Sequence, residues 1–219
     1  MSTQTLIDLD AIGHLPSGST LILTDIPWEG YEQLLAFLGD RSEARVTYDN
    51  GRLEIMSPSQ KHENFTRTIE RLVYAAAEDA DIAIESLGAT TYKQEWLARG
   101  VEPDACFYVE NAKRIIGSDN MDLRIDPPPD IVVQIDVSHD STSKFTIYAG
   151  MGVPELWHYD DRRATIYSLI DKLYVEIPAS RIFPVLTSDT LSRFLDQSKS
   201  AGQAATVKAF REWLRAKHF

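Results

Sequence analysis

Asp104 is the residue whose type and position point most directly to chemistry. It follows a proline and opens a short apolar run. A second run, residues 130–137, contains Gln134 and Asp136, and Lys144 lies near the start of the helical stretch that follows. Oxygen ligands of this kind hold Mg²⁺ or Mn²⁺, and a nearby ammonium group stabilises the charge that develops on a reacting phosphate. These residue types therefore suit metal-dependent hydrolysis of phosphodiester bonds.

The spacing within the second run predicts how the side chains meet. If residues 131–137 form a strand, Gln134 and Asp136 lie on the same face, because side chains alternate along a strand. A neighbouring strand that starts at Asp104 would bring a third oxygen-bearing side chain to them. Lys144 would reach the same place from the following helix. We therefore expect Asp104, Gln134 and Asp136 to bind metal and Lys144 to act in catalysis.

Each of these residues also has an ordinary structural explanation. Asp104 can cap a strand or turn, Gln134 can belong to a hydrogen-bond network, and Asp136 can anchor the start of the next helix. Lys144 can be a solvated helix lysine. His62 lies on the apolar stripe of a long predicted helix, where it is either a packed core histidine or a further residue of the site.

The elements that must position these residues follow from periodicity and turn signals. Asn50-Gly51 between two alternating runs predicts a hairpin over 44–56. Helical spacing predicts helices over 28–38, 58–79 and 141–150, and a helical tail with an apolar stripe that ends at Leu214. Strands are expected at 81–87, 90–95, 104–109, 131–137 and 155–159, with a second hairpin over 164–177.

This order of elements predicts an α/β protein with one mixed β-sheet flanked by helices, an N-terminal hairpin and helix, and a C-terminal helix. We expect three segments along the chain. Residues 1–24 form an extended arm, residues 25–180 form the main domain, and residues 181–219 form a helical extension packed on it.

Composition narrows the class of protein. The chain has 219 residues, of which 43% are hydrophobic and 25% charged, which is enough for a buried core. No apolar run approaches the roughly 20 residues that span a bilayer, and the start has no basic leader before an apolar stretch, so we expect no membrane segment and no signal peptide. The lone cysteine, Cys106, agrees with a cytoplasmic location. A net charge of −11 opposes tight, sequence-independent DNA binding.

The ordered set of motifs resembles the PD-(D/E)XK nuclease superfamily, and more narrowly its "putative restriction endonuclease" family. The similarity covers most of residues 25–170. It rests on 102–104, 129–136, 141–149 and 152–157, together with the upstream segment 51–58 and His62.

The resemblance implies a restriction-endonuclease-like fold and a divalent metal site. Asp104 matches the first metal-binding acid of the family, and Lys144 matches its lysine, displaced from the strand to the helix. The second acid falls at position 134, where this chain has Gln. An amide oxygen binds a cation without charge and therefore more weakly. Asp136 supplies a carboxylate on the same face, although it lies where the usual lysine of the superfamily would be.

Two functions follow from this pattern. The first is a Mg²⁺- or Mn²⁺-dependent endonuclease-like hydrolase of phosphodiester bonds in DNA, weakened by Gln134. The alternative is a catalytically inactive binding or scaffold protein with a nuclease fold. A homodimer is expected in either case.

Overall fold

The chain divides into two units, each with its own sheet. The computed structural model describes residues 12–39, 44–117, 121–137 and 141–217. Residues 1–60 and 91–102 make the first unit, and residues 61–90 and 103–219 make the second. The predicted α/β class, with a mixed sheet flanked by helices, is confirmed. The strands nevertheless form two sheets where the sequence predicted one.

The first unit holds an antiparallel sheet with the strand order β1-β3-β2-β6-β5. The predicted hairpin over 44–56 is confirmed, with Asn50 and Gly51 both at positive φ in its turn. Helix α2 buries Tyr31 and Leu34. The bounds are β1 Thr20–Leu23, α2 Trp28–Leu38, β2 Arg45–Asp49, β3 Arg52–Met56, β5 Tyr92–Gln94 and β6 Arg99–Val101.

Gly100 in β6 lets this strand join the sheet of the first unit. A Cβ atom at position 100 would lie 2.1 Å from the Tyr31 hydroxyl, so only glycine lets the strand pass the buried ring. Gly100 is paired with Tyr48 of β2, and the rings of Tyr31 and Tyr48 are stacked with centroids 4.9 Å apart. The short strand is therefore fixed by aromatic packing rather than by its own side-chain pattern.

The second unit holds a six-stranded mixed sheet with the order β11-β10-β9-β8-β7-β4. Strands β8 and β9 are parallel, whereas the other neighbours are antiparallel. A parallel pair needs a crossover, and α5 supplies it. The bounds are β4 Glu85–Ser86, β7 Ala105–Tyr108, β8 Ile131–Ile135, β9 Glu155–Tyr159, β10 Ala164–Ile170 and β11 Leu173–Ile177.

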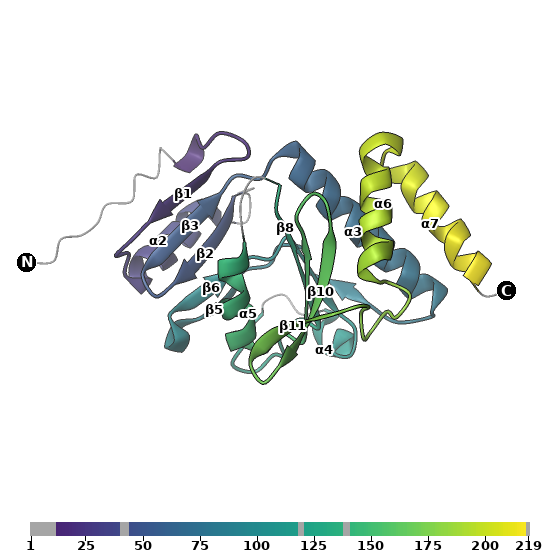
Figure 1. Cartoon of the computed structure of the whole chain (residues 1–219). Helices are drawn as coiled ribbons and strands as arrows, with labels where there is room; N and C mark the ends of the chain where they lie inside the picture. Colours follow the sequence, from purple (N-terminus) through teal and green to yellow (C-terminus); the bar gives the residue numbers. More distant parts are fainter. Residues whose placement is uncertain (1–11, 40–43, 118–120, 138–140, 218–219) are drawn as a thin grey trace, which may run out of the picture. The chain divides into compact units, whose positions relative to one another are not determined.

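Helices of the second unit cover both faces of this sheet (Figure 1). On one face, Ile131, Val133 and Trp157 pack into a core with side chains of α3, α6 and α7. On the other face, Gln134 contacts Tyr148 of α5. The bounds are α3 Gln60–Asp79, α4 Ala112–Ile115, η3 Thr142–Lys144, α5 Phe145–Met151, α6 Ser188–Ala201 and α7 Gln203–Lys217.

Several elements differ from their predicted bounds. The strand expected at 81–87 contracts to Glu85–Ser86, and the expected single C-terminal helix is two helices, α6 and α7, that meet at Gly202. β8 ends at Ile135, two residues before the predicted end. Within the expected arm 1–24, Thr20–Leu23 pairs with β3, while residues 1–11 lie outside the described part of the chain.

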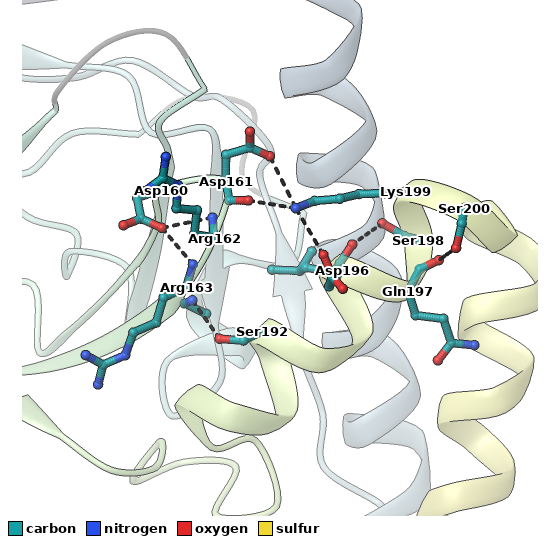
Figure 2. A network of polar contacts seen from close by, with 12 residues as sticks. Asp160, Asp161, Arg162, Arg163, Ser192, Asp196, Gln197, Ser198, Lys199 and Ser200 are labelled. Carbon is teal, nitrogen blue, oxygen red and sulfur yellow. Dashed lines mark hydrogen bonds and ion pairs between the residues drawn. The ribbon is translucent and has the colours of Figure 1, made fainter.

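The turn between β9 and β10 is tied to neighbouring helices by exposed charges (Figure 2). Asp160 accepts hydrogen bonds from the backbone N–H groups of Arg162 and Arg163, at 3.0 and 2.7 Å. Asp161 has a φ of 69°, and its carbonyl accepts a hydrogen bond from Lys199 of α6 at 2.7 Å.

Among the described residues, no helix is both long and apolar enough to cross a membrane.

Candidate active site

Asp104 lies just before β7 and is bound to the neighbouring strand β8. Its N–H donates to the carbonyl of Val133 at 3.0 Å. Its side chain is 2% exposed, and Oδ2 accepts a hydrogen bond from the N–H of Ile135 at 2.7 Å. The carboxylate is therefore held at the end of the strand that carries Gln134.

His62, near the start of α3, lies beside the same carboxylate. Its Nε2 is 3.1 Å from Oδ1 of Asp104, and its Nδ1 is 3.8 Å from the carboxylate of Glu63. Burial alone would lower the pKa of His62, but the interactions with Asp104 and Glu63 prevail and raise it from 6.5 to about 9. At neutral pH His62 is therefore an imidazolium paired with a buried carboxylate.

The electrostatics of Asp104 mirror those of His62. Burial raises the pKa of Asp104, yet the contact with His62, the positive charges of His62 and Lys144, and the N–H of Ile135 together lower it below its ordinary value. Asp104 is therefore ionised, and the charge of Lys144 acts on it.

Gln134 connects Lys144 to Tyr148. Nζ of Lys144 donates to Oε1 of Gln134 at 3.5 Å, and Nε2 of Gln134 donates to the Tyr148 hydroxyl at 2.6 Å. Lys144 and Gln134 are 4% and 1% exposed. Lys144 is thus buried, so the alternative of a solvated helix lysine is wrong.

Asp136 has different partners. It follows the last residue of β8, and its N–H donates to the carbonyl of Tyr159 of β9 at 2.7 Å. Its Oδ2 lies 2.6 Å from Nε2 of His158 and accepts a hydrogen bond from the N–H of Ser141 at 2.9 Å. These contacts agree with the alternative in which Asp136 anchors the start of the next helical segment.

The structure thus brings together four of the five residues singled out in the sequence: Asp104, His62, Gln134 and Lys144. Sequence reasoning missed Tyr148 and His158. Tyr148 lies one helical turn after Lys144. This spacing places both side chains on one helix face and could have predicted that Tyr148 lies near the site. His158 is the register partner of Gln134 across the parallel β8–β9 pair, and that register is not readable from the sequence.

The side chains present fit a hard divalent cation held in part by other ligands. Oδ1 of Asp104 is buried and faces Nε2 of His62 at 3.1 Å, and because a carboxylate oxygen has two lone pairs, it keeps acceptor capacity besides this contact. Oε1 of Gln134 is the second oxygen, beside Lys144. In the part of the chain that is described, no three His, Cys, Asp or Glu side chains form a metal-binding group. Mg²⁺ is often bound by one or two carboxylates, with water and substrate phosphate completing its shell.

Comparison with solved structures finds the same fold in a nuclease-like protein. A crystal structure from Anabaena variabilis, titled a putative nuclease belonging to DUF820, matches with a TM-score of 0.52 and 16% sequence identity. The match covers 79% of this chain and 99% of that chain. At this identity the similarity concerns the fold alone. A comparison with curated proteins gave no match.

A family model spans most of the chain. The model of the Uma2 family, described as "Putative restriction endonuclease", matches residues 28–196. The matched region includes Asp104, Gln134 and Lys144. The chain therefore belongs to the Uma2 family of restriction-endonuclease-like proteins.

Proposed function

We propose that this protein is a divalent-metal-dependent, endonuclease-like hydrolase of phosphodiester bonds in DNA, with a site weakened by Gln134. The observation that carries the proposal is the meeting of Asp104 with β8. Its carboxylate is 2.7 Å from the N–H of Ile135, next to Gln134, whose oxygen is 3.5 Å from the Lys144 ammonium. DNA as the substrate rests on family membership, a weaker argument than the site itself.

The proposed roles follow from the chemistry of each side chain. Asp104 and Gln134 would hold Mg²⁺ or Mn²⁺, which supplies charge stabilisation and a more acidic water when bound. Lys144 would orient the attacking water and stabilise the negative charge that develops on the phosphate. His62 would hold the Asp104 carboxylate in place and balance its charge in the absence of metal. Asp136 would hold the segment that follows β8 in place through its hydrogen bond with the N–H of Ser141.

Cleavage of plasmid DNA tests this proposal. The wild-type protein with Mn²⁺ should nick or cut the plasmid, and a chelator should stop the reaction. Asp104→Ala and Lys144→Ala should each lower the rate at least about 100-fold, since each removes a charge that acts directly on the reacting groups. Cleavage by these variants at the wild-type rate would reject the mechanism.

The second candidate is a catalytically inactive binding or scaffold protein, expected to be a homodimer. Two observations favour it: the neutral side chain at position 134 and the net charge of −11. Gln134→Glu separates the two functions, because it restores the missing charge without changing the size of the side chain. Cleavage that appears only in Gln134→Glu would indicate a site that has lost its activity. Weak cleavage by the wild type that Gln134→Glu strengthens would support the enzyme.

A further inference from the structure

The amide of Gln134 has two ends of opposite character, and the proposed site needs one of them. A carboxylate offers oxygen at both ends, whereas an amide offers an oxygen acceptor at one end and a nitrogen donor at the other. With Gln at this position, metal binding requires that the oxygen face the cation site. A rotation of the amide by half a turn would present N–H groups to the cation and repel it.

Two neighbours act on this orientation from opposite sides. The Lys144 ammonium can only donate hydrogen bonds, so it disfavours the amide nitrogen and favours Oε1, which lies 3.5 Å away. On the other side, the Tyr148 hydroxyl accepts a hydrogen bond from Nε2 at 2.6 Å. Both residues come from the same helical segment, one turn apart, and both are buried.

We infer that Tyr148 is a positioning residue that holds the amide nitrogen of Gln134 and thereby keeps its oxygen turned toward Lys144 and the cation site. This inference rests on the proposed function, because it assigns a purpose to the oxygen end of Gln134. It also gives a physical reason why glutamine serves at a position where a carboxylate is expected. Without the hydroxyl, Nε2 would be a buried donor without an acceptor, and rotation of the amide would become less costly.

A double-mutant cycle separates orientation from simple packing. Mn²⁺ affinity would be measured by calorimetry for the wild type, Tyr148→Phe, Gln134→Glu and the double variant. Tyr148→Phe should weaken Mn²⁺ binding about 10-fold when residue 134 is Gln, the order of effect expected for a group that orients a ligand. In the Gln134→Glu background the same change should cost less than about 2-fold, because a carboxylate has no wrong end.

Tyr174→Phe is the matched control for loss of a tyrosine hydroxyl in the same unit. The Tyr174 hydroxyl donates to the carbonyl of Val153 at 2.9 Å rather than to Gln134, so its removal should leave Mn²⁺ affinity unchanged. Equal losses from Tyr148→Phe in both backgrounds, or no loss in the Gln background, would overturn the inference.

A second measurement needs no metal and no variant. In the wild-type protein, NMR cross-relaxation should link the Gln134 side-chain N–H protons to the ring protons of Tyr148. Links to the methylene protons of Lys144 in their place would show the opposite orientation and overturn the inference. If the wild type fails to bind Mn²⁺, the proposed function fails, and this NMR result still decides the orientation of the amide.

Discussion

Two aspartates in the second unit, Asp104 and Asp161, are each paired with a cation, but they differ in almost every other respect. Asp161 lies in the exposed turn between β9 and β10, with 27% of its side chain accessible. It forms an ion pair with Lys199 (Figure 2) and another with Lys61. Asp104 is 2% exposed and lies beside His62 with one oxygen bound to a backbone N–H. Screening by water weakens the first kind of pair and hardly affects the second.

The difference shows which features identify a site. Asp161 also has two positively charged neighbours, Lys61 and Lys199, and these pairs tie the turn to α3 and α6. Around Asp104, the charged and polar groups converge in a buried place, where the pKa of His62 is raised to about 9 and the pKa of Asp104 is lowered. Perturbed ionisation in a buried cluster is typical of functional groups, whereas a partly exposed ion pair is more often structural.

The largest effect on stability should come from removing the charge of Asp104. Asp104→Asn leaves the His62 imidazolium buried without its counter-charge, so the free energy of unfolding at pH 6 should fall by about 3 kcal/mol. Asp161→Asn is the matched control with the same chemical change at an exposed ion pair, and it should cost less than about 1 kcal/mol. Denaturant titration measures both values. Similar losses in the two variants would remove the distinction between the clusters.

The pH dependence of stability should come next in size. Because the pKa of His62 rises from 6.5 to about 9 on folding, the folded protein binds this proton more tightly than the unfolded chain. The contribution is complete below pH 6.5 and is lost as pH rises through about 9. The contribution of Asp104 has the opposite sign. Its lowered pKa stabilises the fold at pH values above the ordinary pKa of an aspartate, and this contribution is lost as pH falls through the lowered pKa.

Unfolding free energies at pH 6 and pH 9.5 would test this linkage. The wild type should lose about 2 to 3 kcal/mol more than His62→Gln over this interval, from a shift of this size at 1.36 kcal/mol per pH unit with allowance for the coupled pair. Parallel pH profiles for the two proteins would show that His62 is not protonated beside Asp104.

The smallest effect is expected at the exposed cluster. Lys199→Met removes the pairs with Asp161 and Asp196 and should cost less than about 1 kcal/mol in dilute buffer. Most of that cost should disappear at about 1 M salt, where exposed charges are screened. A loss that persists in high salt would mean that Lys199 acts through the packing of its stem rather than through its charge.

Much of the site was predictable from local pattern, and the exceptions have physical reasons. Alternation within the second run correctly placed Gln134 beside Asp104, and the helix spacing correctly brought Lys144 to them. The carboxylate of Asp136 lies against His158, the register partner of Gln134 in β9, and this contact depends on a strand pairing that the sequence does not show. The partnership of Gln134 with Tyr148 depends on how α5 packs on the sheet, which sequence alone does not give.

The fold likewise has elements that the local sequence pattern predicts and elements that it does not. The hairpin over 44–56 and strand β9 follow from turn residues and apolar runs within a few positions. Strands β5 and β6 have three residues each, too few for a period to register, and their pairing depends on Tyr31 fitting against Gly100. The split into two sheets is thus decided by tertiary packing, which the sequence pattern does not express.

The central claim is that Asp104 and Gln134 hold a divalent cation, and a calorimetric titration with Mn²⁺ tests it most directly. The wild-type protein should bind Mn²⁺ at or below millimolar concentration, Gln134→Glu should bind it more tightly, and Asp104→Asn should show no binding. Absence of binding by the wild type, or equal binding by the wild type and Asp104→Asn, would contradict the account.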